Sequence, residues 1–220
     1  MADFLELELM IPALIETIIM VFFSTLISVI LGLPLGVLLF LTEKGGIWEK
    51  PKLNSVLGTI VNILRSFPFL ILMIAIIPFT RLIVGTTTGT AAIIVPLSIS
   101  AFPFVGRIVE SSLREVSPGL IEAAQSMGST TFEIIKKVLI PEALPSIVSG
   151  ITLTIINLIG YSAMAGAIGA GGLGDLAMRY GYYRYEIKIM VISVVVIILL
   201  VQIIQVIGNK ISISIINKRK

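Results

Sequence analysis

Cysteine and histidine are both absent from this chain of 220 residues. The lack of cysteine excludes disulfides, thiolate metal sites and cysteine nucleophiles. The lack of histidine removes the side chain that normally titrates near neutral pH. Charged residues are scarce: they make up 13% of the chain, against about a quarter in a soluble domain, while hydrophobic residues make up 56%. The net charge of +3 is too small to indicate a nucleic-acid partner. So little polar surface favours lipid as the solvent, and the composition therefore indicates an integral membrane protein.

Several long apolar stretches are each able to cross a bilayer, which takes about 20 mainly apolar residues. Strands of a membrane barrel would alternate apolar and polar residues, whereas these stretches are continuously apolar, so we expect helices. The sequence predicts an all-α polytopic membrane protein with about five transmembrane helices, forming a single domain over residues 1–220. The predicted spans are residues 17–41, 56–80, 91–109, 146–170 and 187–207.

The distribution of charge predicts the orientation of the chain. Residues 1–10 carry Asp3, Glu6 and Glu8 but no Lys or Arg, so we expect no cleaved signal peptide, which would begin with a basic segment. Basic residues gather in the first loop, the third loop and the C-terminal tail, which the positive-inside rule places in the cytoplasm. The prediction is N-out and C-in, although two arginines then lie in an outer loop, at Arg179 and Arg184. The basic residues predicted to be cytoplasmic are Lys44, Lys50, Lys52, Arg107, Arg114, Lys136, Lys137, Lys210, Lys218, Arg219 and Lys220.

Glycine and proline interrupt three of the predicted spans. Membrane helices tolerate such residues where neighbouring groups satisfy the backbone. They are compatible with kinks and close helix packing, of which a G-x-x-x-G spacing is typical. Flexible helices that line a pathway are the alternative interpretation, and packing is the one we favour for any single residue. The residues concerned are Gly32, Pro34, Gly36, Pro68, Pro78, Pro96 and Pro103.

Residues 110–145, the long third loop, hold most of the polar information in the chain. Ser117 suits the cap of a helix and Pro118 its first position. Gly128 is placed to end this helix, because glycine is preferred directly after a helix C-terminus. We therefore predict a short helix followed by a glycine turn on the cytoplasmic side of the membrane.

A second helix is predicted directly after this turn. Thr130 and Glu133 have the spacing of a capping box, in which two side chains satisfy the free N–H groups of a helix start. Pro141 and Pro145 are expected to close this helix and to begin the fourth span. A helix, a turn and a helix held between two spans can lie on the membrane surface and present a projection to a soluble partner.

One motif in this loop resembles a known family. Glu122-Ala123-Ala124, three residues, Gly128, nine residues and Val138-Leu139-Ile140-Pro141 are similar to the EAA loop of bacterial ABC importer permeases, with two conservative departures at Val138 and Ile140. The resemblance implies that this loop is a coupling helix docking into a cleft of an ATPase subunit. Glu122 would then face the ATPase, Ala123 and Ala124 would allow close approach, and Gly128 would supply the turn.

The same resemblance implies an assembly. Permeases of this family work as pairs, here a homodimer, with two ATPase subunits in the cytoplasm and a solute-binding protein outside, in the cytoplasmic membrane of a bacterium. The chain itself has no Walker A pattern, G-x-x-x-x-G-K-[ST]. We therefore expect no enzyme activity, no metal site and no cofactor in this chain, with ATP and Mg²⁺ bound by the partner ATPase.

Further segments are similar to the methionine-uptake subfamily of these permeases. The main one is the block over residues 61–69, and others lie at 77–86, 161–164 and 168–174. The last segment also resembles phosphonate and osmoprotectant permeases, so a phosphonate or a betaine remains an alternative solute to D- or L-methionine. A gradient-driven carrier or a channel is a further alternative, but the sequence shows no clear inverted repeat or set of intramembrane charges for ion coupling. A membrane scaffold without transport would not need the whole EAA spacing.

Two other patterns point to chemistry that the chain does not support. Gly169, Gly171 and Gly174 match G-x-G-x-x-G, but a dinucleotide site needs a preceding strand, and here the motif ends a predicted span. We interpret it as a tight loop at the outer mouth. Gly160-Tyr161-Ser162 is reminiscent of intramembrane serine proteases, which need a histidine.

Arg65 lies inside a span, where a charge is either functional or extends to the membrane surface. Candidates for the pathway or outer gate are Arg65, Met73, Met164, Gly169, Gly171, Gly172 and Gly174.

Overall fold

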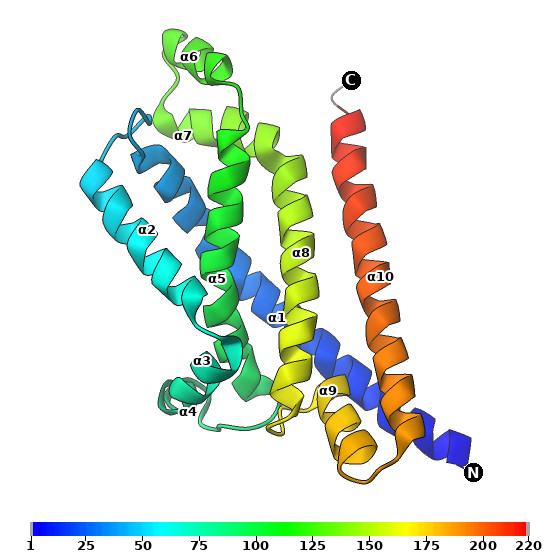
Figure 1. The fold of residues 1–220 in the computed structure, drawn as a ribbon. Helices are drawn as coiled ribbons and strands as arrows, with labels where there is room; N and C mark the ends of the chain where they lie inside the picture. The colour runs from blue at the N-terminus through cyan, green and yellow to red at the C-terminus, as the bar shows by residue number, and fades with distance from the viewer. Residues whose placement is uncertain (1, 219–220) are drawn as a thin grey trace. The chain divides into compact units, whose positions relative to one another are not determined.

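The computed structural model describes residues 2–218, with side chains from residue 8 onwards (Figure 1). Asp3, Glu6, Arg219 and Lys220, which entered the predicted charge pattern, therefore lie outside the described side chains. Every regular element in the described part is helical, which confirms the all-α prediction. The elements are α1 (Ala2–Thr42), α2 (Pro51–Ser66), α3 (Phe69–Ala75), α4 (Ile77–Val84), α5 (Thr90–Arg114), α6 (Pro118–Ser126), α7 (Thr131–Ile134), the π-helical turn η1 (Ile135–Leu139), α8 (Ile140–Gly166), α9 (Gly172–Leu176), the π-helical turn η2 (Ala177–Tyr182) and α10 (Ile187–Asn217).

Within residues 2–218, four helices are long and apolar enough to cross a membrane. They are Glu8–Thr42, Thr90–Arg114, Thr131–Gly166 and Ile187–Asn217, and the bent pair of α2 and α3 is a fifth candidate. This agrees with the prediction of about five spans. The helices run past most of the predicted ends, because a helix continues beyond the apolar stretch wherever no residue stops it.

The second predicted span, residues 56–80, is not one straight helix. It is divided into α2, α3 and α4, with the first break at Phe67 and Pro68. Pro68 has φ −59° and ψ 129°, an extended conformation, and serves as the N-cap of α3. Proline has no N–H to continue the ladder of α2, and it disfavours helical geometry at Phe67 before it.

The predicted helix end at Pro141 and Pro145 is wrong. The chain is helical without interruption from Thr131 to Gly166. In a regular α-helix the Pro141 ring would meet the carbonyl of Lys137. Lys137 lies inside the π-helical turn η1, whose wider winding falls directly before this proline. The fourth membrane helix is therefore continuous with the second helix of the predicted cytoplasmic loop.

The chain forms two compact units, each assembled from three stretches of sequence. Unit 1 contains Met1–Ile27, Phe67–Ala101 and Thr154–Gln205. Its core is apolar and includes Met20, Leu97 and Leu158 at 0% exposure, with the rings of Phe69 and Tyr161 stacked at 4.7 Å between centroids. Unit 2 contains Ser28–Ser66, Phe102–Leu153 and Val206–Lys220.

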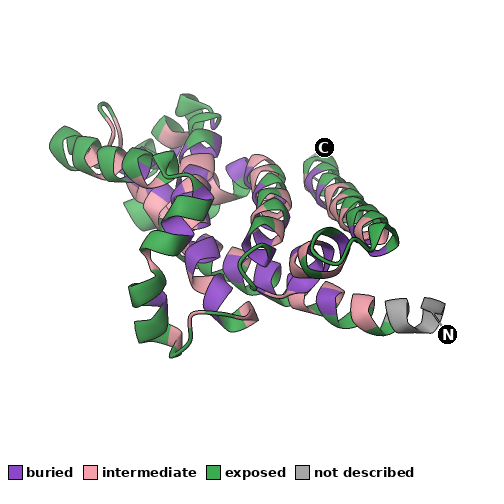
Figure 2. Ribbon diagram, turned by 60° about the horizontal axis from the view of Figure 1, so that its bottom comes forward, coloured by how far each residue is buried: buried purple, intermediate pink, exposed green. Residues whose placement is uncertain are grey.

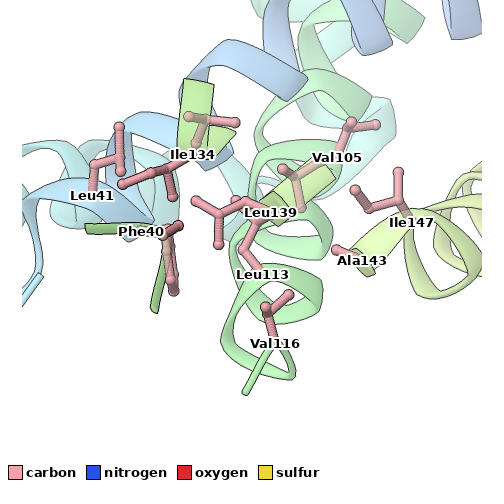
Figure 3. Close-up of a cluster of buried hydrophobic side chains, with 12 residues drawn as sticks. Phe40, Leu41, Val105, Leu113, Val116, Ile134, Leu139, Ala143 and Ile147 are labelled. Atoms are coloured by element: carbon pink, nitrogen blue, oxygen red, sulfur yellow. The ribbon is translucent and has the colours of Figure 1, made fainter. Parts of the chain in front are cut away.

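The core of unit 2 lies where α1, α5, α7, η1 and α8 meet. Figure 3 shows Leu113 and Leu139 pointing toward one another, with Phe40 beside them, and both leucines are fully buried. Gly32 and Gly36 of α1 lie against Val105 and Val109 of α5, so here the G-x-x-x-G spacing serves close helix packing.

Outside these cores the long helices carry exposed residues along much of their length (Figure 2). Helix α10 is the extreme case, since only 11% of its most apolar window is buried. Its exposed residues are mainly Ile, Val and Leu, such as Ile198 at 53% and Leu199 at 55%. A surface this apolar is suited to lipid or to another protein chain rather than to water.

Candidate functional site

We refer to residues 117–141 of unit 2 as the coupling segment. Its first helix, α6, begins at Pro118 with Ser117 as N-cap, as predicted, although the Ser117 side chain makes no capping hydrogen bond. Proline is well suited to the first helical position, where an N–H would have no partner.

A Schellman motif ends α6. The N–H of Gly128 donates to the carbonyl of Gln125 at 2.9 Å, and the N–H of Ser129 donates to the carbonyl of Ala124 at 3.1 Å. These are the two hydrogen bonds that define this C-terminal motif. Gly128 has φ +79°, in the left-handed region that glycine adopts without strain. The predicted glycine turn is therefore confirmed.

The capping box at the start of α7 is also confirmed. The Thr130 hydroxyl accepts the N–H of Glu133 at 3.3 Å, and the Glu133 carboxylate accepts the N–H of Thr130 at 3.1 Å. Lys137, one turn later, donates to the same carboxylate at 3.0 Å. The turn that joins the two helices of the coupling segment is thus fixed at both ends, by the Schellman motif on one side and by the capping box on the other.

Buried side chains fasten the coupling segment to the core of unit 2. Ala124 on α6 is 4% exposed and packs in the same cluster as Val116, Ile134 and Leu139. Ile121, one turn before Ala124, is partly buried against this cluster. Ala124 therefore faces the chain's own core rather than a partner. Its small size allows α6 to approach that core closely.

Other residues of the coupling segment are exposed. Glu122 and Ala123 are exposed, and so is Pro141. Large apolar side chains accompany them: Leu120 is 45% exposed, Met127 79% and Phe132 70%. Exposed apolar groups gathered on one segment are typical of a protein-binding surface. These three apolar residues were not predicted from the sequence to be part of a binding surface. They lie away from the buried sides of their helices.

A pocket of about 390 Å³ opens beside α6 in unit 2. Glu122 and Gln125 of α6 line one side, and Glu43 and Arg114 line another. Polar and charged groups therefore share this hollow with the apolar side chains of Phe40 and Ile121.

An ionic network that the sequence analysis missed lies next to this pocket. Glu110 of α5 is 2% exposed and pairs with both Arg107 and Arg114 at 2.7 Å. Arg114 also pairs with Glu43 at 2.8 Å. Glu110 lies three residues after Arg107 and four before Arg114. Residues with these spacings are neighbours on one face of a helix, so the sequence could have indicated the two ion pairs.

The glycine loop of unit 1 is held against α1. The N–H of Gly172 donates to the Glu16 carboxylate at 2.6 Å, and the N–H of Leu173 donates to the Thr17 hydroxyl at 2.9 Å. Leu173 is fully buried, and Gly174 is buried against the backbone of Ala163. Gly169 and Gly171 both have positive φ, as a tight loop requires. Glu16 is therefore an anchor of this loop.

The other pathway candidates are scattered. Met73 is 2% exposed in the core of unit 1, whereas Met164 is 49% exposed. The guanidinium of Arg65 is exposed and lies 5.2 Å from the ring centre of Phe104, within range of a cation–π contact. Among the residues that the structure describes, no three acidic side chains are grouped so that they would hold a metal ion.

Comparisons with known proteins agree on one family. The family model described as "Binding-protein-dependent transport system inner membrane component" matches residues 32–211. A protein of Vibrio cholerae named "Probable D-methionine transport system permease protein MetI" is 56% identical over 178 residues, covering 81% of this chain and 79% of that protein. A protein of the same name from Pasteurella multocida is 54% identical over 167 residues, covering 76% and 77%. A solved chain of the "MetNI methionine ABC transporter", in inward-facing conformations, superposes with a TM-score of 0.94 at 47% identity, covering 95% of this chain and 97% of that one.

Proposed function

The chain belongs to the family of binding-protein-dependent transport system inner membrane components, and from this premise we propose that it is the permease subunit of an ATP-driven methionine importer in the cytoplasmic membrane of a bacterium. The observation that carries the proposal is the identity of 54% to 56% with relatives named as D-methionine permeases. The block over residues 61–69, which resembles the methionine-uptake subfamily, supports the same solute.

The coupling segment is the proposed contact with the ATPase. Glu122 and Ala123 are exposed on α6, and the apolar side chains of Leu120, Met127 and Phe132 are exposed on the same segment. An apolar patch that includes one carboxylate suits a cleft with apolar walls and a basic group. ATP and Mg²⁺ are bound and hydrolysed by that separate ATPase, and this chain supplies the receiving surface and the membrane helices. Leu139 contributes by fixing the far end of the segment to the core of unit 2, and Pro141 is exposed beside it in the sequence.

The proposed assembly is a homodimer of this chain with two ATPase subunits and one solute-binding protein. Five helices make a thin wall for a pathway, so a second copy is the simplest way to enclose one. The apolar exposure of α10 supports contact with lipid or with a second copy. The predicted orientation, N-out and C-in, puts the coupling segment in the cytoplasm and the glycine loop outside.

At the outer side we propose that the glycine loop helps to close the pathway. Gly171 and Gly172 bring the backbone close to α1, where Glu16 and Thr17 accept its N–H groups. The selectivity of the importer is then assigned mainly to the binding protein, while Met164 and Arg65 remain candidates for lining the path.

Reconstitution tests the proposed solute. The chain, its ATPase and its binding protein are placed in vesicles, and ATP-dependent uptake of labelled methionine is measured. We expect accumulation of methionine that an excess of phosphonate or betaine does not reduce. If betaine or phosphonate competes for uptake and unlabelled methionine does not, the solute is wrong while the family assignment stands. Uptake driven by an ion gradient without ATP would refute the importer class.

A charge reversal tests the proposed ATPase contact. Glu122→Lys places a positive charge on the exposed face of α6, and we expect it to weaken binding of the ATPase and to lower uptake. Glu49→Lys is the matched control, because Glu49 is also exposed and lies in the predicted first cytoplasmic loop, outside the coupling segment. Both variants should insert normally, since neither position lies within a predicted span. Full uptake by Glu122→Lys would remove this residue from the contact.

A further inference from the structure

Glu110 is a carboxylate in a place where carboxylates are rarely found. Its side chain is 3% exposed, near the end of the third predicted span. Both of its oxygens are paired: Oε2 with Nη1 of Arg107 at 2.7 Å, and Oε1 with Nη2 of Arg114 at 2.7 Å. Removing a charge from water is costly unless it is paired and hydrogen-bonded. Here the pairing is complete, so Glu110 is an organising centre for two arginines.

Each of these arginines continues the network to another part of unit 2. Arg107 uses its Nη2 to donate to the carbonyl of Gly58 at 3.0 Å and to the amide oxygen of Asn62 at 2.9 Å, both on α2. Arg114 uses its Nε to donate to the Glu43 carboxylate at 2.9 Å, just after the end of α1. A guanidinium has five donors in a rigid fork, which suits it to such bridging.

The two ends of this network lie at functionally different places. At one end, Glu43 and Arg114 line the pocket that Glu122 and Gln125 of α6 also line. At the other end, Asn62 lies in the block of α2 that resembles the methionine-uptake subfamily. Glu110 therefore pairs with one arginine that lines the same pocket as the coupling segment and with another that is hydrogen-bonded to α2.

We propose that Glu110 is a positioning residue for transport, which transmits the displacement of α6 to α2 through Arg114 and Arg107. This inference rests on the proposed function. Apolar side chains that pack together can slide past one another, but short hydrogen bonds between buried charges have one favoured geometry. A displacement of the residues that line the pocket thus rotates or shifts α5, and the residues of α2 that are hydrogen-bonded to Arg107 move with it. Without the carboxylate, the two arginines repel each other and lose the partner that fixes the positions of their side chains on α5.

The first experiment compares variants in the reconstituted complex, with methionine uptake and ATP hydrolysis measured in the same vesicles. Glu110→Gln keeps the shape and removes the charge, and Arg107→Lys keeps the charge but cannot reach Glu110 and both acceptors of α2 together. We expect both to lower the methionine taken up per ATP about tenfold, within the range by which mutations in coupling networks act. The KM for the loaded binding protein should not change. Glu115→Gln, an exposed neighbour on the same stretch, should leave the ratio unchanged.

The second experiment follows the helices directly, which is practical because the chain has no cysteine. A spin label is placed at Ile63→Cys on α2 or Ser126→Cys on α6, both exposed positions. The distance between the labels of the two copies is measured without nucleotide and with trapped ATP. In the otherwise unchanged chain both distances should change. With Glu110→Gln, the change at residue 126 should persist and the change at residue 63 should disappear.

A merely structural role for Glu110 predicts a different result. If the change at residue 63 persists in Glu110→Gln, or if uptake per ATP stays at the level of the unchanged chain, the proposal is overturned. If Glu110→Gln does not assemble, Arg107→Lys is judged by the same two criteria. Absence of methionine uptake by the unchanged chain would instead contradict the proposed function, and the label distances would still decide the role of Glu110.

Discussion

Substitution of Gly128 is the sharpest test of how the coupling segment is built. This residue has φ +79°, and a Cβ added there would meet nothing within 4 Å. The cost of a side chain is therefore one of backbone conformation and not of space. For an ordinary residue, left-handed geometry costs about 1 to 2 kcal/mol, and a β-branched residue is a clear outlier there. At 1.4 kcal/mol per tenfold, a cost of about 2 kcal/mol lowers the population of the native turn about thirtyfold.

We therefore expect Gly128→Val to displace the helices on either side of the turn. The Schellman hydrogen bonds of residues 128 and 129 depend on this conformation, and the capping box begins two residues later. Gly128→Asn is the matched control, because asparagine tolerates left-handed geometry much better than valine. In vesicles, Gly128→Val should lose ligand-stimulated ATP hydrolysis and uptake while inserting normally, and Gly128→Asn should keep most of both.

Two results would refute this reasoning. Full uptake with ligand-stimulated hydrolysis in Gly128→Val would show that the turn does not transmit anything. Equal damage in Gly128→Val and Gly128→Asn would show that the backbone conformation of residue 128 is not the cause, and that a side chain of any kind obstructs the partner surface.

Three further predictions follow from local geometry. Thr130→Ala removes the capping box and should lower the stability of the detergent-solubilised protein by about 1 kcal/mol in thermal unfolding. Thr131→Ala, at the next and exposed position, should change the stability little. Equal effects of the two substitutions would contradict the role of the cap. Gly174→Ala sets a Cβ against the backbone of Ala163 and should destabilise the protein by about 1 to 3 kcal/mol. Gly160→Ala, with open space around it, should be neutral or stabilising, and a reversed order would refute the packing argument. For topology, a cysteine at Ser55 should react with an impermeant reagent only from the cytoplasm and one at Thr88 only from outside; labelling of both from one side would end the predicted orientation.

Local signals in the sequence predict local structure well in this chain. The start of α6 at Pro118, its end before Gly128 and the capping box of Thr130 and Glu133 each depend on residues within a few positions of one another. The helical class and the approximate spans likewise follow from apolar length alone. These features require no knowledge of which helices meet.

Features that depend on distant contacts were not predictable in the same way. The network of Glu110 involves Asn62 and Gly58, about fifty residues away in the chain, and pattern reasoning does not pair α2 with α5. The burial of Ala124 is similar, because the motif identifies it as small but not which side it faces. At Pro141 a local rule was overridden, since the π-helical turn η1 allows the helix to continue.

A helix of nine residues such as α6 is too short to be stable by itself in water. Its conformation must come from the Schellman motif at its C-terminal end and from the packing of Ile121 and Ala124 on the core of unit 2. The same contacts that make α6 a helix therefore attach it to the helices it is proposed to move. Unwinding α6 at its end would break the Schellman motif, so we expect a force applied to its exposed face to be passed to the core on which it packs. Under the proposed function, the contacts that stabilise this segment are also the ones that transmit the force, and substitutions that loosen α6 should reduce coupling before they reduce folding of the whole chain.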